Sequence, residues 1–315
     1  MVPSTFRTIF KPILERNQIN YASEIILFGS CFSENIGKKL DYFKFKTASN
    51  PYGILFNPLA IENAIKECLE NKRYTKNELT FDQGFWHSLN HHSDFSDIDS
   101  DSVLNKINTR ITKTHVGLKT VSHLIITFGT SWIYELKESK KPVANCHKIP
   151  QIKFNKRLLS VNEIEESIRT IKKCVLNRNP EATIIFTVSP VRHLKDGMTE
   201  NMRSKAHLLS AIHNSTDEKS NYFPSYEIMM DDLRDYRFYK EDMIHPNKTA
   251  IEYIWERFCY SWVSKEMNEI QKEIDKIQKG LSHKPFNPNS TNHKNFLSEL
   301  ESKINKLKDN HGIAF

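Results

Sequence analysis

Two short stretches of this sequence carry side chains that could act together as a nucleophile and its base. Ser30 and Cys31 follow a short apolar run, and Asp242 and His245 stand three residues apart near the start of a later helix. A thiol or hydroxyl at a helix start lies beside unpaired N–H groups and the positive end of the dipole, which lowers a thiol's pKa and can hold an oxyanion. A carboxylate near an imidazole fixes the tautomer of the ring while the ring takes a proton. The two stretches therefore predict a nucleophile, a base and an orienting carboxylate.

Each stretch also has a purely structural interpretation. The turn at Ser30 can serve only as a helix cap, and His245 can merely close the last helix. Cys31 can be a small buried residue that packs the turn. The combination of both stretches in this order favours the catalytic interpretation.

The residues between these stretches predict the elements that position them. Short β-branched runs alternate with segments of helical period, which is typical of parallel strands joined by crossover helices. We expect strands at residues 25–28, 43–48, 123–128, 182–188 and 226–230. We expect helices up to residue 40 and at 58–70, 98–121, 161–177, 200–213 and 248–263. The predicted fold class is α/β, a three-layer α/β/α arrangement around a doubly wound, mostly parallel sheet.

Two segments fall outside this plan. Residues 80–101 are rich in Asp, His, Ser and aromatic residues without a clean period, and we expect an irregular excursion there. Residues 264–315 contain two charged helical stretches, at 264–279 and 296–307, separated by a Pro- and Asn-rich break. We expect one main domain over 1–263 and a helical C-terminal appendage over 264–315.

Composition excludes several classes of protein. The 315 residues are 38% hydrophobic and 26% charged with a net charge of +7, which indicates a folded globular protein. The basic residues are scattered and no nucleic-acid module accompanies them, so we expect no nucleic-acid partner. No stretch approaches the roughly 18 apolar residues of a membrane span, and the first residues do not resemble a signal peptide. Five widely spaced cysteines without a C-x-x-C pair suit a reducing compartment, and we expect a cytoplasmic location.

Ligands of open parallel sheets bind beyond the carboxyl ends of the strands, where this sequence places several polar loops. Arg192 and His193 follow one predicted strand and could steer a negatively charged or polyhydroxylated substrate. Alternatively, Arg192 pairs with Asp235 or Asp242 and locks its loop.

Imidazole, thiolate and carboxylate groups could also bind a transition metal. The candidates are His87, His91, His92, Asp94, Cys146, His147 and His193, for which we favour substrate contacts or hydrogen bonds over a metal, and we expect no cofactor.

The motifs together resemble the GSCFA-domain family, over roughly residues 5–265 in motif order. The motifs that carry the resemblance are Gly29-Ser30-Cys31-Phe32-Ser33, Asn50-Pro51-Tyr52-Gly53, His91-His92-Ser93, Thr127-Phe128-Gly129-Thr130, Asn145-Cys146-His147-Lys148, Ser189-Pro190-Val191-Arg192-His193 and Asp242-Met243-Ile244-His245-Pro246. That family is grouped with the SGNH/GDSL hydrolases, so the resemblance implies their three-layer, flavodoxin-like fold and acyl-ester chemistry. It does not settle what its members act on.

The resemblance also implies site residues. If Gly29 takes the place of the GDSL glycine, Cys31 stands where the nucleophilic serine would be; Ser30 is the nucleophile if the glycine shifts by one. In SGNH relatives a glycine N–H and an asparagine side chain complete the oxyanion hole. Here Asn50 and Gly53 lie in the second loop, and the third loop has a Gly-x-Ser sequence without the asparagine. The other candidates for oxyanion or substrate contacts are Gly129, Thr130, Ser131, Arg192, His193, His92 and His147.

These observations predict a hydrolase or acyltransferase in which Cys31 or Ser30 attacks an ester, His245 takes the proton and Asp242 orients His245. A small-molecule or glycan ester is the expected substrate, the glycan by analogy with the wider superfamily. One alternative is a non-catalytic binding protein with a degenerate cleft, and another is a metal-dependent hydrolase. Hydrolysis or transfer, and the oligomeric state, stay open.

Overall fold

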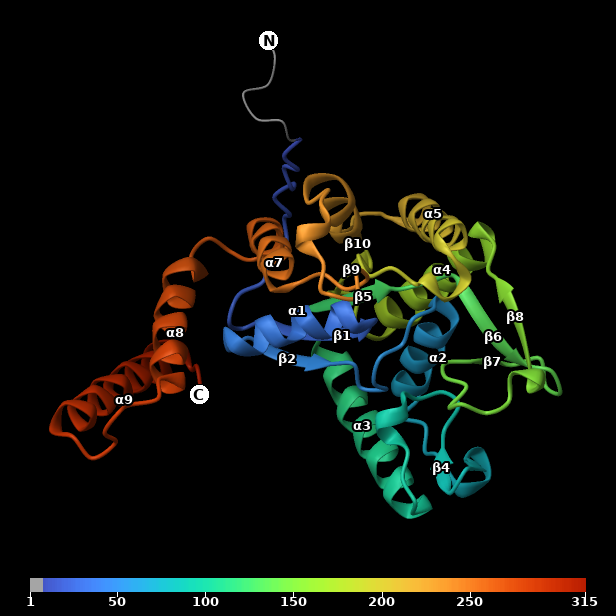
Figure 1. Cartoon of the computed structure of the whole chain (residues 1–315), viewed down its shortest axis with the longest axis horizontal. Helices are drawn as coiled ribbons and strands as arrows, with labels where there is room; N and C mark the ends of the chain where they lie inside the picture. The colour runs from blue at the N-terminus through green and yellow to red at the C-terminus, as the bar shows by residue number, and fades with distance from the viewer. Residues whose placement is uncertain (1–7) are drawn as a thin grey trace, which may run out of the picture.

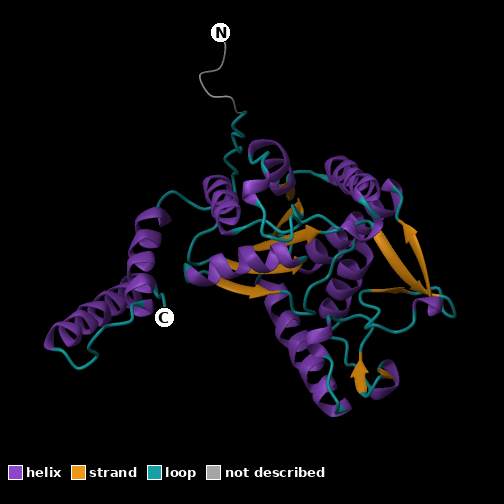
Figure 2. Cartoon of the chain, in the orientation of Figure 1, coloured by secondary structure: helices purple, strands orange, loops and turns teal. Residues whose placement is uncertain are grey.

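A five-stranded parallel sheet forms the centre of the protein. The computed structural model describes residues 8–315, and Figures 1 and 2 show the sheet between layers of helices. Its strand order is β10-β9-β5-β1-β2, which is the doubly wound, flavodoxin-like order 2-1-3-4-5 read from the other edge. The strands are β1 (Glu24–Gly29), β2 (Lys46–Ser49), β5 (His123–Phe128), β9 (Thr183–Val188) and β10 (Ser220–Tyr222). All four strand pairs run parallel.

The apolar side chains of each strand divide between two hydrophobic cores. In β1, Ile26 and Phe28 face one core, whereas Ile25 and Leu27 face the other. This alternation follows from the two-residue period of a strand, and a strand that is buried on both faces reads as an unbroken apolar run. The runs in β1, β5 and β9 therefore predicted buried central strands, and this expectation is confirmed.

Helices cover both faces of the sheet, so the expected three-layer α/β/α architecture is confirmed. One core lies under α2 (Pro58–Leu69), α3 (Ser100–Thr120), α4 (Val161–Arg178) and α5 (Met198–Ser215). The other lies under α1 (Cys31–Tyr42) and α7 (Lys248–Trp262). Most of these helices begin at a Ser, Asn or Asp whose side chain accepts a backbone N–H, as helix caps do.

The predicted strand at residues 226–230 is wrong. The fifth strand is the shorter β10, and residues 226–230 lie in the α6 turn (Ser225–Glu227) and the π-helical turn Ile228–Asp232 that follows it. A short apolar run does not by itself distinguish a strand from a buried helical turn. Here Ile228 and Met229 are both buried in the same core, which a strand with alternating faces would not allow. The second strand also begins three residues later than predicted.

Two small antiparallel sheets lie outside the central one. The segment expected to be an irregular excursion holds a short hairpin of β3 (Thr80–Asp82) and β4 (Phe85–His87). A second sheet, which the sequence analysis missed, is formed by β6 (Trp132–Leu136), β7 (Pro142–Val143) and β8 (Phe154–Leu158). It is inserted directly after the loop that ends β5, so it adds polypeptide beside the carboxyl edge of the sheet.

Two helices, α8 (Met267–Ser282) and α9 (Thr291–His311), form the C-terminal part of the chain at one end of the molecule, where α8 lies next to α7 and α9 packs against α8 (Figure 1). Ile274 and Ile277 on α8 are buried in the same core as Trp255 on α7. The helical character predicted for this segment is thus observed, while its division from the main domain at residue 264 stays a prediction. Within residues 8–315, no helix is long and apolar enough to cross a membrane.

Candidate functional site

The turn between β1 and α1 places Ser30 and Cys31 at the carboxyl edge of the sheet. Gly29 has a φ of +145°, and a Cβ there would lie 2.3 Å from the backbone oxygen of Thr127 on β5. Glycine is therefore required where the turn passes β5. Ser30 is the N-cap of α1, is 0% exposed, and its Oγ accepts the N–H of Phe32 at 3.3 Å. The turn thus uses the Ser30 hydroxyl for capping and leaves the next side chain partly exposed.

Cys31 is that partly exposed residue, and its surroundings act on the thiol in opposite directions. Burial raises the pKa of Cys31, while the backbone N–H groups at the start of α1 and the charge of Lys205 lower it and Glu34 raises it further. Burial outweighs the helix terminus, so the expectation that this position lowers the thiol pKa is wrong. A thiol in this setting gives up its proton only when a base takes it.

The Asp242–His245 loop has the geometry of a base with its orienting carboxylate. Asp242 Oδ2 lies 2.7 Å from His245 Nδ1, and Asp242 Oδ1 accepts the backbone N–H groups of Ile244 and His245 at 2.9 Å each. These backbone donors and the His245 ring lower the pKa of Asp242 to about 2. The carboxylate therefore holds the ring by Nδ1, and Nε2 faces away from it.

The two stretches are joined through the loop that follows β9. Arg192 donates its backbone N–H to Ile244 O at 3.4 Å, and burial together with the charges of Lys205 and His245 lowers the pKa of His193 to about 3. The charge of Lys205 acts on both His193 and Cys31. All these groups therefore gather at one edge of the sheet. Among the described residues, however, no hydrogen bond joins His245 to Ser30 or Cys31.

Arg192 binds the neighbouring loop rather than an acid. Its guanidinium donates to Met243 O at 3.4 Å and stacks over the Tyr239 ring, 4.3 Å from the centroid. This arrangement is closer to the loop-locking alternative than to the substrate-steering one, although the guanidinium's partners are one backbone oxygen and an aromatic ring, and not Asp235 or Asp242. His193 differs, because its Nε2 is buried without a hydrogen-bond partner in the part of the chain that the structure describes.

Most of the predicted oxyanion donors are already engaged. The N–H groups of Gly129 and Thr130 both donate to Phe56 O, at 2.7 and 3.0 Å, and the N–H of Gly53 donates to Asn50 O at 2.8 Å. The hydroxyls of Thr130 and Ser131 both bond to Ser204 on α5. These groups hold the loops in place, and their role as oxyanion donors stays a prediction.

Asn50 differs from these residues because half of its amide is unused. Its Oδ1 accepts the N–H of Gly29 at 2.9 Å, and Asn50 itself has a left-handed backbone with a φ of +46°. Its Nδ2 is buried and has no hydrogen-bond partner within the described residues. A buried donor without a partner is costly, and it would gain from a polar atom bound beside it.

His92 and His147 lie with other histidines beyond β2. The backbone N–H of His92 donates to Tyr52 O at 2.9 Å, and His92 Nδ1 lies 3.1 Å from Asp94 Oδ2. His147 Nε2 bonds Ser88 O at 2.8 Å. The ring of His147 stacks on His87 at a centroid distance of 4.7 Å. Across the residues that the structure describes, no three metal-ligating side chains are close enough to hold a metal ion, so the metallohydrolase alternative gains no support.

One face of α5 organises two of the strand-end loops, and the sequence analysis missed it. Asn201 Oδ1 accepts the N–H of His193 at 2.9 Å, and Ser204 Oγ accepts the N–H of Ser131 at 2.8 Å. Lys205 Nζ donates to backbone oxygens of two loops. The sequence did contain a signal for this face. Leu208, Ala211 and Ile212 form an apolar stripe, and Asn201, Ser204 and Lys205 lie on the same side of the helix one and two turns earlier. Polar side chains on the buried face of a helix indicate that nearby backbone groups need them as hydrogen-bond partners.

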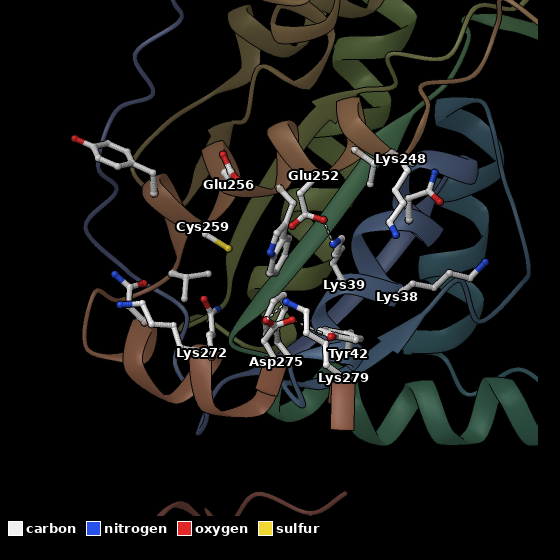
Figure 3. A pocket seen from close by; sticks show the side chains of 18 of the residues that line it. Lys38, Lys39, Tyr42, Lys248, Glu252, Glu256, Cys259, Lys272, Asp275 and Lys279 are labelled. Atoms are coloured by element: carbon white, nitrogen blue, oxygen red, sulfur yellow. Dashed lines mark hydrogen bonds and ion pairs between the residues drawn. The ribbon is translucent and has the colours of Figure 1, made fainter. Parts of the chain in front are cut away.

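A groove of about 990 Å³ lies elsewhere, between α1, α7 and α8 (Figure 3). Lys39 pairs with Glu252 across it, and Asp275 accepts hydrogen bonds from Tyr42 and Lys279 at 2.9 and 2.6 Å. The Lys39–Glu252 pair joins α1 to α7, and the Tyr42–Asp275 hydrogen bond joins α1 to α8. The groove begins at Asn35, about one turn along α1 from Cys31, and includes none of the predicted site residues.

The protein is an α/β/α protein with a doubly wound parallel sheet. The polar side chains of the candidate site gather at the carboxyl ends of the strands of this sheet. The chain belongs to the GSCFA family, whose model matches residues 24–258, and the model of the GSCFA domain protein C-terminal domain matches residues 274–314. The resemblance inferred from the motifs is therefore confirmed. No curated protein sequence matches the chain.

The structure is similar to two solved esterase structures. A carbohydrate esterase family 3 protein from Talaromyces cellulolyticus is 8% identical, with a TM-score of 0.38, and the match covers 79% of this chain and 99% of that chain. An acetyl xylan esterase from the rumen bacterium Butyrivibrio proteoclasticus is 10% identical, with a TM-score of 0.35, and the match covers 84% of this chain and 66% of that chain.

Proposed function

We propose that this protein is an ester hydrolase or acyltransferase, with Cys31 as nucleophile, His245 as base and Asp242 as the residue that orients His245. One observation carries the proposal: the loop of the bonded Asp242–His245 pair is hydrogen-bonded to the loop after β9. Lys205 joins that loop to the end of β5, against which the turn before α1 rests. A nucleophile, a base and an orienting carboxylate are the three parts that covalent acyl transfer needs.

Cys31 suits the nucleophile's role better than Ser30. The Ser30 hydroxyl is fully buried and occupied as the helix cap, whereas the Cys31 side chain is partly exposed. The raised pKa of Cys31 is compatible with this role, because the base removes the thiol proton during the attack and not before it.

In the proposed reaction, Cys31 Sγ attacks the ester carbonyl carbon while His245 Nε2 takes the thiol proton. The tetrahedral intermediate collapses as the carbon–oxygen bond to the alcohol breaks, and His245 returns the proton to the leaving alkoxide. Water or a second alcohol then attacks the thioester and gives its proton to His245, and as the carbon–sulfur bond breaks His245 passes this proton to the leaving Cys31 sulfur. The products are an acid or a new ester, and the Cys31 thiol is restored.

The oxyanion of the intermediate needs donors that are free in the resting protein. At the start of α1 the Phe32 N–H is taken by the Ser30 hydroxyl, whereas the N–H groups of Cys31 and Ser33 have no hydrogen-bond partner among residues 8–315. Asn50 Nδ2 is a second donor at the same edge, and it has no bond within residues 8–315. Asn50 could thus serve in place of the asparagine that the third loop lacks.

The experiment compares hydrolysis of a panel of simple acyl esters and acetylated sugars by wild-type protein, Cys31→Ala, Ser30→Ala and His245→Ala. We expect activity to disappear in Cys31→Ala and to fall about 100-fold or more in His245→Ala. Ser30→Ala should lose about 1 kcal/mol of stability with its cap but keep its activity. Full activity of Cys31→Ala would reject the mechanism. Adding an alcohol as acceptor separates transfer from hydrolysis.

A non-catalytic binding protein is the second candidate. The observation that favours it is that no hydrogen bond connects His245 with Cys31 among the described residues, although both lie at one edge. This candidate predicts that esters bind without turnover, and that binding is equal in wild type and Cys31→Ala. Calorimetric titration with a non-hydrolysable ester analogue, run beside the activity assay, distinguishes the two.

A further inference from the structure

Lys205 is a buried lysine at the centre of the candidate site. Its side chain is 1% exposed, and Nζ donates to Gly129 O and Ser189 O at 2.7 Å each. These oxygens belong to the residues that directly follow β5 and β9. Lys205 therefore joins the ends of two neighbouring central strands. The turn that carries Cys31 also rests against the end of β5, because Ser30 donates its backbone N–H to Thr127 O at 3.2 Å. Lys205 and Cys31 also act on each other electrostatically.

The charge of Lys205 has no anionic partner among residues 8–315. No carboxylate forms an ion pair with Lys205 in the part of the chain that the structure describes, and both of its hydrogen bonds go to neutral backbone oxygens. An ammonium group has three N–H donors, so one is left over. A buried cation without a counter-ion is costly, and a purely structural position would be cheaper with an apolar side chain. We therefore expect an anion to form beside the Lys205 ammonium at some stage of the reaction.

We propose that Lys205 is the buried counter-charge of this site, and that its ammonium stabilises the thiolate of Cys31 when the proton leaves. The S–H bond breaks, the electron pair stays on sulfur, and the proton goes to His245 in the reaction or to hydroxide in solution. This inference depends on the proposed function in one respect, because it takes Cys31 as the nucleophile. Lys205 acts through Cys31 and is a positioning residue.

The groups that face this pair determine how the effect depends on pH. Burial lowers the pKa of Lys205 to about 7, so its charge is present in acid and is lost as the pH rises. Glu34 on α1 opposes the thiolate. From the other elements, His193 lies near Lys205, His245 lies near His193, and the Tyr226 ring lies 5.7 Å from Lys205 Nζ. The support that Lys205 gives to the thiolate should therefore be strongest below pH 7.

The test is the rate at which iodoacetamide alkylates Cys31 between pH 6 and pH 10, read by peptide mass spectrometry with Cys174 as an internal reference. In Lys205→Met we expect the Cys31 rate at pH 6.5 to fall about tenfold or more, a shift of one pKa unit, and to converge with wild type at pH 10. Lys205→Arg keeps its charge at every pH and should keep the fast rate above pH 7. Lys113→Met, an exposed change on α3, should match wild type.

The wild-type profile is itself diagnostic if Lys205→Met does not fold. Loss of the Lys205 charge should produce a shoulder above pH 7, and the shoulder should persist in His245→Ala. A single uninterrupted rise in wild type, or a folded Lys205→Met whose profile coincides with wild type, would overturn the proposal. Alkylation requires no ester turnover, so a protein that shows the shoulder but hydrolyses no ester would reject the proposed function and leave this inference intact.

Discussion

Asp242 holds His245 by two different groups, accepting the backbone N–H with Oδ1 at 2.9 Å and contacting the ring Nδ1 with Oδ2 at 2.7 Å. Asp242 thus orients the His245 ring from within the same loop. The same loop is held by Arg192, which stacks on Tyr239 and bonds Met243 O. The Asp242–His245 pair is therefore fixed within a single loop, and its position relative to Cys31 depends on the loop after β9.

The Asp242–His245 pair predicts a larger loss of activity in His245→Ala than in Asp242→Asn. His245→Ala should lower kcat/KM for ester hydrolysis about 100-fold or more, because it removes the proton acceptor. Asp242→Asn should cost about tenfold or more, because the ring loses the carboxylate that fixes its tautomer. Steady-state kinetics on purified variants measures both, with the exposed His283→Ala as control. A wild-type rate in His245→Ala would contradict the mechanism.

The Gly29 turn predicts a difference between two glycine substitutions. Gly29→Ala should destabilise the protein by about 3 kcal/mol, because its φ of +145° disfavours a side chain and the new Cβ meets Thr127 O at 2.3 Å. Gly84→Ala is the matched control: its φ is +83°, but no atom lies within 4 Å of the new Cβ, so about 1 kcal/mol is expected. Urea unfolding measures both. Equal losses would show that the contact with β5 is unimportant.

The central sheet was predictable because each of the buried strands β1, β5 and β9 contains a run of at least three apolar residues and ends at a polar turn. Periodicity alone could not identify residues 226–230, because a short apolar run fits a strand buried on both faces as well as a helical turn, and only the turn places Ile228 and Met229 in the same core. The β6–β8 sheet escaped notice for a related reason, since the burial pattern of β8 shows only one fully buried residue, Phe154. Half-exposed short strands leave little apolar pattern to read.

The candidate site was predictable only in part. Strand ends and helix starts are local features, and they placed Cys31, Asn50 and His245 at the carboxyl edge. Which of these groups is free depends on long-range partners that no spacing reveals. Ser204 occupies the hydroxyls of Thr130 and Ser131 from a helix some 70 residues later, and burial, which reverses the expected pKa direction of Cys31, is a property of the whole fold.

The buried His91 predicts a loss of stability in mild acid. Burial, with the charges of Lys72 and His147, lowers the pKa of His91 to about 3, whereas an unfolded histidine titrates near 6.5. The unfolded state therefore binds more protons between these values, and the free energy of unfolding should fall as the pH drops below about 6.5. His91→Phe keeps a ring on Tyr52 and should flatten the slope by up to about 1.4 kcal/mol per pH unit.

Denaturant unfolding at pH 7, 6 and 5 measures this slope for wild type and His91→Phe. The exposed His311→Asn on α9 is the control for removing a histidine. An unchanged slope in His91→Phe would mean that His91 does not contribute to acid sensitivity.

Ser204 predicts that the third loop depends on α5 for its stability. Ser204 Oγ accepts the Ser131 N–H at 2.8 Å and bonds the Thr130 hydroxyl at 3.0 Å, and the site is buried. Ser204→Ala leaves these groups without that partner, so we expect a loss of about 1–3 kcal/mol in urea unfolding. Ser210→Ala lies on the exposed face of the same helix and should change stability by less than about 0.5 kcal/mol. Because the same loop supplies Gly129 O to Lys205, Ser204→Ala should also slow alkylation of Cys31 at pH 6.5. A variant as stable as Ser210→Ala would show that the loop keeps its conformation without α5.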